Sequence, residues 1–440
     1  MNIGIVSLGC AKNLVDTEVM LGILGGEGHQ IVSDPGEADV IIVNTCAFID
    51  SAKEESIQTV LEMAAYKEDR CRLLILCGCL AERYHDEILA ELPEVDAVVG
   101  TGDYPKIAEV INKAFAGEKV VLYGHMNDPL PDENRMLSTP GYMAYSKIAD
   151  GCDNKCTYCV IPSLRGSYRS RPMEEIVAEA KNFAESGVRE LVLIAQDTSR
   201  YGIDLYGEYR LPALLSELCK IQKLHWIRVL YLYPEMITDE LIDVFAREDK
   251  IVKYMDIPIQ HAHDKVLKQM GRHLSNQDLL NLVTKLRSRV PGITLRTTVI
   301  AGFPSESEEE FDTLLNFITW ARFDRLGAFP YSQEEGTPAA RLPGQLPEEV
   351  RIERAEKILK VQEAISLSLQ EEKLGRVIEV LVEGYDDESL MYFGRSAGDA
   401  PEVDNTVYFA SEEEHCAGDF VSVEILNAQT YELHGRSVLE

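Results

Sequence analysis

The chain has 440 residues, of which 45% are apolar and 27% charged, so it is long and apolar enough for about three domains with buried cores. A disordered or fibrous protein is therefore excluded. The formal net charge of −31 excludes broad binding to nucleic acid or anionic membranes through a cationic face. It favours a basic partner or simple solubility.

The N-terminal sequence and the cysteine usage predict a cytoplasmic protein with metal or redox chemistry. The chain begins without a positively charged leader, and no apolar run approaches the ~18 residues that span a bilayer. We therefore expect a cytoplasmic protein without a membrane partner. In a reducing compartment, clusters among the ten cysteines indicate metal or redox sites rather than disulfides.

The first 125 residues repeat a short apolar run, a turn and a helical pattern. The apolar runs lie at 3–8, 40–43, 73–76 and 95–99. Continuous runs that alternate with helices predict a parallel sheet covered on both faces. Ligands of such sheets gather at the carboxyl ends of the strands. Cys10, Cys46 and Cys79 follow three of these runs, so we expect them to converge on one site.

After residue 125 the pattern changes. Residues 126–141 are polar and Pro-rich, which predicts a linker. Six predicted strands follow, separated by helical patterns, at 144–148, 190–195, 227–232, 254–257, 294–300 and 325–329. Six βα units are fewer than the eight of a closed barrel, so we expect a partial, six-unit barrel.

The C-terminal part is predicted to be a long helix followed by a small β-structure. Residues 347–374 form a charged helical pattern bounded by Pro347 and Gly375. Residues 376–440 contain short alternating apolar segments joined by Gly, Asp and Asn. This pattern predicts a small all-β barrel.

The strongest chemical signal is a C-x3-C-x2-C run directly after the first predicted barrel strand. Its members are Cys152, Cys156 and Cys159, called the loop trio below. Three thiolates at this spacing can bind three irons of a four-iron four-sulfur cluster, which leaves the fourth iron open to a substrate or cofactor. The alternative is a zinc site with a fourth ligand elsewhere in the chain.

The loop trio resembles the signature of the radical S-adenosylmethionine superfamily, in which an aromatic residue precedes the last cysteine. Tyr158 fills that position and is a candidate cofactor-binding residue. The resemblance implies that the loop trio binds the radical cluster and that the open iron binds S-adenosylmethionine. Cleavage of this cofactor then yields a deoxyadenosyl radical, so no acid or base catalyst is expected.

A second trio resembles the ligands of the auxiliary cluster in the methylthiotransferase branch of that superfamily. Its members are Cys10, Cys46 and Cys79, called the auxiliary trio below. The alternative is that these are inert core cysteines. Cys77 lies on the same side of an extended chain as Cys79 and competes with it. We favour Cys79 because it begins the turn and matches the family motif.

The whole chain resembles the methylthiotransferase layout. The implied parts are a methylthiotransferase domain with the auxiliary cluster (1–125), a linker (126–141), a radical S-adenosylmethionine barrel with its C-terminal helix (142–374) and a TRAM domain (375–440). The fold class is therefore α/β, with an N-terminal parallel α/β domain, a partial (β/α)6 barrel and a C-terminal all-β barrel.

Polar residues on the barrel strands are candidates for binding S-adenosylmethionine. They are Gln196 and Asp197 at the end of the second strand, Gln260 after the fourth, and Arg296 and Thr298 on the fifth. Active sites of barrels lie at the carboxyl ends of strands, within reach of such side chains. Each has the alternative role of an ordinary hydrogen-bonded strand residue.

Two branches of the methylthiotransferases compete for the chain. One modifies an adenosine of transfer RNA, and the other methylthiolates the β-carbon of an aspartate in the twelfth protein of the small ribosomal subunit. Residues 376–440 carry 15 acidic and 3 basic side chains, a net charge of −12 that complements a basic ribosomal protein and disfavours tRNA. The segment 7–16, SLGCAKNLVD, also resembles the ribosomal-protein branch more closely.

We therefore expect a ribosomal-protein methylthiotransferase, with tRNA modification as the alternative. The resemblance implies two four-iron four-sulfur clusters, S-adenosylmethionine as radical source and methyl donor, and an electron donor such as a flavodoxin or ferredoxin. A more distant alternative is a noncatalytic iron–sulfur electron-transfer protein with fully ligated clusters. The basic segment 165–171 either forms a rim for an acidic group or pairs with carboxylates of the chain.

Overall fold

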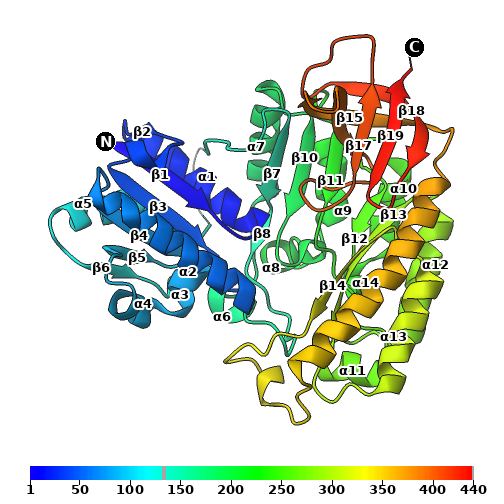
Figure 1. Cartoon of the computed structure of the whole chain (residues 1–440), viewed down its shortest axis with the longest axis horizontal. Coiled ribbons are helices and arrows are strands. Elements are labelled where there is room, and N and C mark those ends of the chain that lie inside the picture. The colour runs from blue at the N-terminus through cyan, green and yellow to red at the C-terminus, as the bar shows by residue number, and fades with distance from the viewer. Residues whose placement is uncertain (131–134, 439–440) are drawn as a thin grey trace.

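The structure is a computed structural model that describes residues 1–130 and 135–438. Figure 1 shows an α/β part in blue and cyan, a barrel in green and yellow, and a β-structure in red. Residues 131–134 belong to the predicted linker and lie outside the described residues. The division of the chain into domains at residues 125, 141 and 374 stays a prediction.

The N-terminal sheet is parallel throughout and has the strand order β2-β1-β3-β4-β5-β6. Its strands are β1 (Asn2–Ser7), β2 (Gln30–Ile31), β3 (Val40–Thr45), β4 (Leu73–Gly78), β5 (Ala97–Val99) and β6 (Val120–Leu122). The predicted parallel sheet is confirmed. Edge strands β2 and β6 were not predicted, because two or three residues are too few to produce a clear apolar run.

Helices cover both faces of this sheet, as predicted. They are α1 (Ala11–Gly26), α2 (Asp50–Ala64), α3 (Cys79–Arg83), α4 (His85–Glu91) and α5 (Ile107–Phe115). Val19 of α1 packs with Ile42 on one face, whereas Val60 of α2 packs with Ile41 on the other. Successive residues of β3 therefore serve opposite helical layers.

The described end of the predicted linker packs against α1. The Met136 amide donates to the Glu18 carbonyl oxygen at 3.1 Å. The Ser138 amide donates to Glu18 Oε1 at 2.8 Å. Burial raises the pKa of the Glu18 carboxyl, while Arg135 and the Ser138 hydrogen bonds oppose that rise. Residues 135–138 are therefore anchored to the N-terminal part of the chain.

The middle of the chain forms the partial six-unit barrel that the sequence predicts. The strands are β7 (Met143–Lys147), β10 (Glu190–Ile194), β11 (Trp226–Val229), β12 (Tyr254–Asp256), β13 (Thr294–Ala301) and β14 (Arg325–Pro330). They form two parallel sheets, β11-β10-β7 and β12-β13-β14. Hydrogen bonds from Ile227 N to Lys250 O (2.8 Å) and from Val252 N to Ile227 O (3.1 Å) join the two. Within the described chain β7 and β14 do not pair, so the barrel is open on one side.

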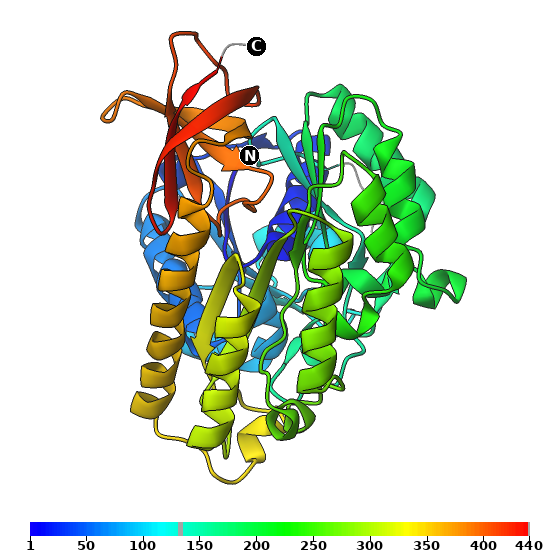
Figure 2. The same ribbon diagram turned by 90° about the vertical axis from the view of Figure 1, so that its right-hand side faces the viewer.

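Helices form the outer layer of the barrel (Figure 2). The longer ones are α7 (Met173–Glu185), α9 (Leu211–Cys219), α10 (Asp239–Arg247), α12 (Asn276–Arg289), α13 (Glu308–Ala321) and α14 (Glu348–Glu371). Short elements lie in the loops: β8 (Ala149–Asp150), α6 (Ile161–Arg165), β9 (Arg169–Ser170), α8 (Ile203–Tyr206) and α11 (Asp264–Gln269).

The inner surface of the barrel faces two other parts of the chain. On β10, Leu191 packs with the outer helices, whereas Val192 packs with lumen residues such as Tyr254. Leu14 of α1 and Leu381 of the C-terminal part belong to the same lumen group. Helix α1 therefore covers part of the lumen, and it lies beside β7 in Figure 1.

The C-terminal part is a closed five-stranded barrel, as predicted, with the strand order β15-β16-β17-β19-β18. Its strands are β15 (Val377–Asp386), β16 (Met391–Ser396), β17 (Thr406–Ala410), β18 (Phe420–Ala428) and β19 (Glu432–Ser437). Strands β16 and β19 were not predicted. Their sequences MYFGRS and ELHGRS place glycine and charge inside the strand, which hides the alternation.

Buried ion pairs fix this small barrel to the larger one. Glu190 accepts from Arg228 Nε at 2.8 Å and from Arg395 Nη2 at 2.6 Å. Asp399 accepts from Arg325 Nη2 at 2.5 Å. Burial alone would raise the pKa of Glu190, but Arg395 and Arg228 lower it.

No helix in the described part of the chain is long and apolar enough to cross a membrane.

Candidate active site

The auxiliary trio follows three neighbouring strands of the N-terminal sheet. Cys10 caps α1 just after β1, Cys46 follows β3, and Cys79 begins α3 directly after β4. A Cβ placed on Gly9 would lie 2.7 Å from Cys46 Cβ and 3.0 Å from Cys46 Sγ. Gly9 has a φ of 85°, which glycine adopts readily. The loop that carries Cys10 therefore lies directly against Cys46.

Two buried asparagines hold the loops of this trio. Asn13 donates through Nδ2 to the carbonyl oxygens of Leu8 (3.1 Å) and Thr45 (2.9 Å). Asn44 donates through Nδ2 to the Asn13 carbonyl oxygen at 2.8 Å. These bonds tie the end of β1, the end of β3 and the first turn of α1 into one unit.

Cys77 is separated from the auxiliary trio by its environment. It packs among Ile3, Val19 and other apolar residues beneath α1 and α5. Burial alone raises the pKa of its thiol, with no nearby charge opposing it. Cys79, in contrast, lies 3.8 Å from Asn13 Oδ1 and 3.8 Å from Arg165 Nη2. The structure thus brings Cys79 rather than Cys77 into contact with the polar side chains Asn13 and Arg165, which lie close to Cys10.

The auxiliary trio lies close to positive charge. Burial would raise the pKa of the Cys10 thiol, but Lys12 and Arg165 lower it below its ordinary value. Burial raises the pKa of Cys79 to about 12, opposed by Arg165 and reinforced by Cys10 and Cys46. Burial also raises the pKa of Cys46. The three thiols are therefore close enough to interact electrostatically.

The loop trio sits at the carboxyl end of the barrel, between β8 and α6. Thr157 anchors the loop: its amide donates to Met270 O at 3.0 Å and its Oγ1 to Gln269 O at 2.7 Å. Gly271 has a φ of 76°, and a Cβ there would lie 2.6 Å from Lys155 O. This close approach fixes the loop against the turn after α11.

The thiols of the loop trio are half-buried and close to one another. Burial raises the pKa of Cys152 to about 11 and of Cys159 to about 12, and Cys156 raises both further. Three cysteines on one loop fit an iron–sulfur cluster, because a bound metal stabilises the thiolate. Within the described residues no three His, Cys, Asp or Glu side chains meet closely enough to share one ion.

A buried ionic network joins α1 to the barrel beside the auxiliary trio. Arg165 at the end of α6 donates to Asp16 Oδ2 at 2.5 Å and lies 3.4 Å from Asp150 Oδ2. Lys147 Nζ is 3.0 Å from the same Asp150 oxygen. The four side chains are 2–4% exposed. Because Asp16 belongs to α1 and the other three belong to the barrel, the network fixes α1 relative to the barrel strands.

The network also reaches one predicted cofactor residue. Gln196 donates through Nε2 to Asp150 Oδ1 at 2.7 Å, and Arg165 contacts Cys79 Sγ at 3.8 Å. A continuous polar path therefore runs from the auxiliary trio to the end of β10.

Glu334, in the loop after the last barrel strand, forms a second contact with the segments that carry the auxiliary trio. Glu334 is 2% exposed and lies 2.8 Å from Arg83 Nη1 and 3.0 Å from Lys53 Nζ. Arg83 also donates to Ala47 O at 2.9 Å. Since Arg83 lies on α3 with Cys79, and Ala47 follows Cys46, Glu334 restrains both loops.

The predicted cofactor residues at the end of β10 have different surroundings. Gln196 Oε1 is buried and has no hydrogen-bond partner in the described structure, so one acceptor remains available. Asp197 is fully buried and accepts from Asn154 Nδ2 at 2.8 Å. Burial raises the pKa of Asp197, while Ser199, Asn154 and Arg200 lower it. Asp197 is therefore placed to hold the cysteine loop.

The candidates on the second half of the barrel also differ. Gln260 has a φ of 69° and bridges to Val299, so its backbone is in the left-handed region at the barrel mouth. Thr298 lies three residues before the end of β13 and is half-buried. Arg296 lies 3.0 Å from Asp256 and 3.4 Å from Asp404 of the C-terminal barrel, which already neutralise its charge.

Tyr158 is half-buried and packs with Val266, Met270 and Phe303. Burial raises the pKa of its hydroxyl well above the ordinary value, and Cys156 raises it further. The Tyr158 ring thus packs against residues that lie next to the loop carrying the loop trio. Contact between Tyr158 or any of the other candidates and S-adenosylmethionine stays a prediction.

The basic segment 165–171 was predicted either to form a rim for an acidic group or to pair with carboxylates of the chain. Arg165 pairs with carboxylates as described, and Arg171 lies 3.1 Å from Glu179. The ion-pairing alternative therefore describes these two arginines. Lys12 and Arg200 were not predicted, although Lys12 stands in the cysteine motif and Arg200 closely follows Asp197.

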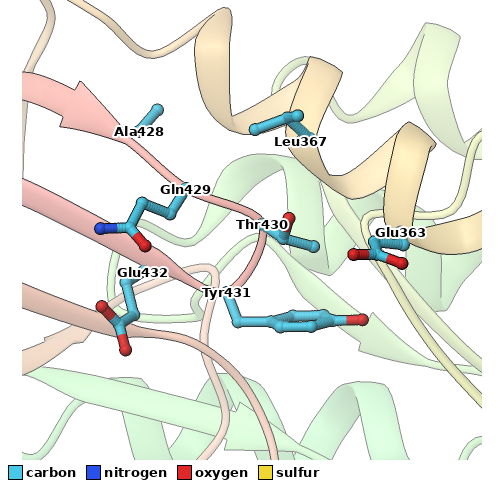
Figure 3. A pocket seen from close by; sticks show the side chains of 7 residues that line it. All are labelled: Glu363, Leu367, Ala428, Gln429, Thr430, Tyr431 and Glu432. Atoms are coloured by element: carbon cyan, nitrogen blue, oxygen red, sulfur yellow. The ribbon is translucent and has the colours of Figure 1, made fainter.

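A hollow of about 460 Å³ lies elsewhere, between α14 and the turn that joins β18 to β19 (Figure 3). It is lined by Glu363 and Leu367 of α14 and by residues 428–432. No cysteine lines it, so it is separate from the two trios.

The partial barrel with a cysteine trio on its first loop, joined to a second trio on a parallel sheet, defines a radical S-adenosylmethionine methylthiotransferase. Three family matches agree with this class. Residues 146–318 match the Radical SAM superfamily, residues 2–100 match the Uncharacterized protein family UPF0004, and residues 374–438 match the TRAM domain.

Full-length relatives narrow the class. The chain is 52% identical over 444 residues to the ribosomal protein uS12 methylthiotransferase RimO of Pelotomaculum thermopropionicum, covering 100% of both chains. It is 50% identical over 436 residues to the RimO of Thermoanaerobacter sp., covering 99% of both. The chain belongs to the RimO family. It is therefore an enzyme that uses S-adenosylmethionine and four-iron four-sulfur clusters.

Solved structures share the fold at low identity. The radical S-adenosylmethionine methyltransferase TsrM from Kitasatospora setae has a TM-score of 0.59 at 14% identity, covering 83% of this chain and 89% of that chain. The cobalamin-dependent S-adenosylmethionine radical enzyme OxsB has a TM-score of 0.52 at 11% identity, covering 83% and 56%. These likenesses concern the fold alone.

Proposed function

We propose that this chain replaces a hydrogen on the β-carbon of an aspartate in ribosomal protein uS12 with a methylthio group. The observation that carries the proposal is identity of about 50% to RimO relatives along essentially the whole chain. The target C–H bond is not acidic enough for a side-chain base, so a radical reaction is needed. The hydrogen leaves with deoxyadenosine, and sulfur and a methyl group take its place.

We assign one cluster to each cysteine trio. The loop trio would hold the radical cluster, and the auxiliary trio would hold the second. When bound, these cofactors supply the electron that cleaves S-adenosylmethionine and the sulfur that is transferred. The protein contributes a fixed geometry, because the buried pairs of Arg165 and Lys147 with Asp16 and Asp150 set α1 against the barrel.

We also assign roles to the predicted cofactor residues. The unpartnered Gln196 Oε1 suits the amino group of S-adenosylmethionine. Gln260 and Thr298 remain candidates for further polar contacts from the opposite sheet. Asp197 and Arg296 act through other groups, since Asp197 accepts from Asn154 and Arg296 pairs with Asp256.

Charge supports a basic substrate. Part of the acidity of residues 376–440 is used internally, because Asp399 and Asp404 pair with Arg325 and Arg296. Other acidic residues, such as those at 412–414, are exposed. They would attract a basic ribosomal protein in the cytoplasm and repel tRNA. An electron donor such as a flavodoxin or a ferredoxin would reduce the radical cluster at its half-buried loop.

The test is anaerobic incubation of the reconstituted enzyme with S-adenosylmethionine, dithionite, sulfide and either uS12 or tRNA. We expect a peptide of uS12 to gain the mass of a methylthio group in place of hydrogen, with deoxyadenosine as coproduct. Methylthiolated adenosine in the tRNA arm would favour the tRNA alternative instead. Absence of deoxyadenosine in both arms would favour a noncatalytic electron-transfer protein.

A further inference from the structure

Lys12 extends from the N-terminal part of the chain to the mouth of the barrel. It lies in the first turn of α1, two residues after Cys10. Its Nζ stands 3.4 Å from the centroid of the Tyr231 ring, just past the end of β11. The ammonium group is therefore positioned between the auxiliary trio and the carboxyl ends of the barrel strands.

Tyr231 forms a fixed platform for this ammonium group. Its φ of 62° is rare for a residue with a side chain, which points to a constrained backbone at a functional position. Neighbouring strand ends hold it: its amide donates to Asp256 Oδ2 at 3.1 Å, and its carbonyl accepts from Thr198 N at 3.0 Å. The ring also packs with the lumen residues of the barrel.

Lys12 has no carboxylate partner in the described structure, unlike four other cations around the lumen. Within the described residues no Asp or Glu oxygen lies within 4.0 Å of its Nζ, whereas Lys147, Arg165, Arg228 and Arg296 all have such partners. A cation–π contact compensates only part of the loss of hydration. The site therefore presents a positive charge that no carboxylate of the described chain neutralises, in a protein with a net charge of −31.

Arg200 is a second cation near the barrel mouth for which no carboxylate lies within 4.0 Å among the described residues, but it contacts the loop that carries the loop trio. Its Nη1 lies 3.3 Å from Asn154 Oδ1 on the cysteine loop, and its charge lowers the pKa of buried Asp197. Lys12 therefore lies near the auxiliary trio, and Arg200 lies near the loop trio.

We propose that the Lys12 ammonium binds the carboxylate of the target aspartate and thereby selects it. The inference rests on the proposed function and extends it to the residue that recognises the side chain. A carboxylate is bonded directly to the β-carbon, so anchoring it at Lys12 fixes the reacting carbon beside Cys10. The helix N-terminus of α1, which has no acidic residue in its first turn, adds to the attraction for an anion.

The test compares two substrate peptides and three enzyme variants. The peptides span the target site of uS12 and carry either the native aspartate or the isosteric asparagine. The variants are Lys12→Met, which keeps length and removes charge, Lys12→Arg, which keeps charge, and Lys181→Met as a matched control. Lys181 is exposed on α7 and distant in the chain from either trio. Iron content and visible absorption are checked in every variant before the assay.

We expect the unmodified enzyme to prefer the aspartate peptide by about 10- to 100-fold in kcat/KM, as a charge-assisted contact implies. Lys12→Met should lower kcat/KM for the aspartate peptide by a similar factor and remove the preference. Lys12→Arg should retain part of it, and Lys181→Met all of it. Peptide affinity measured by fluorescence anisotropy, without turnover, should show the same loss.

Two outcomes would overturn the proposal. An unchanged preference for aspartate over asparagine in Lys12→Met would show that another group reads the carboxylate. A raised KM for S-adenosylmethionine with that preference intact would assign Lys12 to the cofactor instead. If the unmodified enzyme modifies neither peptide, the proposed function fails, while the anisotropy comparison still reports whether Lys12 distinguishes the two side chains.

Discussion

The two cysteine trios differ in their spacing along the sequence and in the contacts that support them. The loop trio spans eight residues of one segment, whereas the auxiliary trio draws on strand ends separated by about 70 residues. The loop trio is supported mainly by its own barrel, through Thr157, Met270 and Gly271. The auxiliary trio depends in addition on contacts from another part of the chain, through Arg165 and Glu334. The loop trio is therefore a local site, formed by one segment. The auxiliary trio is an assembled site, which depends on the interface between the N-terminal sheet and the barrel.

Because of this difference, a substitution that loosens the interface between α1 and the barrel should affect the auxiliary trio more than the loop trio. Loosening α1 from the barrel changes the surroundings of Cys79 but leaves the spacing of the loop trio unaltered. Separate measurement of the two clusters therefore tests whether the auxiliary trio is the dependent one.

The largest expected effect comes from removing one cysteine of each trio. Cys156→Ser should abolish deoxyadenosine formation and remove about half of the bound iron. Cys46→Ser should remove a similar amount of iron and abolish the methylthio product, while the loop trio still supports deoxyadenosine formation. Iron analysis, electron paramagnetic resonance and product chromatography measure these three quantities.

The matched control for the cysteine variants is Cys77→Ala. Because Cys77 packs among apolar residues and contacts neither trio, both clusters should remain, with a loss of about 1 kcal/mol in stability from the small cavity. Loss of a cluster in Cys77→Ala, with Cys79→Ala unaffected, would exchange the roles of these two cysteines.

Arg165→Met tests the ionic link between α1 and the barrel. It leaves Asp16 and Asp150 buried with only Lys147 to neutralise them, which should lower the free energy of unfolding by about 3–5 kcal/mol. We expect the auxiliary cluster to be lost more readily than the radical cluster. Urea denaturation and cluster-resolved spectra report the two effects. Arg289→Met, on an exposed pair, should change stability by no more than about 1 kcal/mol. Equal loss of both clusters would contradict the dependence of the auxiliary site on the interface.

The sequence made the two trios visible but not the link between them. Apolar runs and strand-end cysteines are local signals, so the parallel sheet, the partial barrel and both trios followed from pattern or resemblance. Arg165, Asp16 and Glu334 are ordinary charged residues in sequence, and their pairing depends on how distant elements pack. Short β2 and glycine-containing β16 were not predicted for a related reason. Pairing with neighbouring strands, rather than local alternation of apolar and polar residues, makes them strands.

Glu334→Gln should loosen the auxiliary loops with a smaller effect. The substitution keeps the shape but removes the charge that Arg83 and Lys53 share, which should lower stability by about 1–3 kcal/mol. Hydrogen exchange should rise in the segments after Cys46 and Cys79, with the loop trio protected as before. Glu309→Gln, on the exposed face of α13, is the control and should fall within about 0.5 kcal/mol of the parent. Unchanged exchange near Cys46 would mean that Ala47 is held without this clamp.

The smallest effect is expected for a substitution in the loop that carries the loop trio. Thr157→Val removes the hydroxyl that donates to Gln269 O but leaves the backbone bond to Met270, so stability should fall by about 0.5–1.5 kcal/mol. Because the Thr157 hydroxyl fixes the cysteine loop to Gln269, the radical cluster should show altered spectra and slower deoxyadenosine formation, while the auxiliary cluster keeps its signal. Thr284→Val, which removes a similar hydroxyl bond on exposed α12, controls for the substitution itself. A change confined to the auxiliary signal would reverse the assignment of local and assembled sites, because the lost hydroxyl bond joins two segments of the barrel.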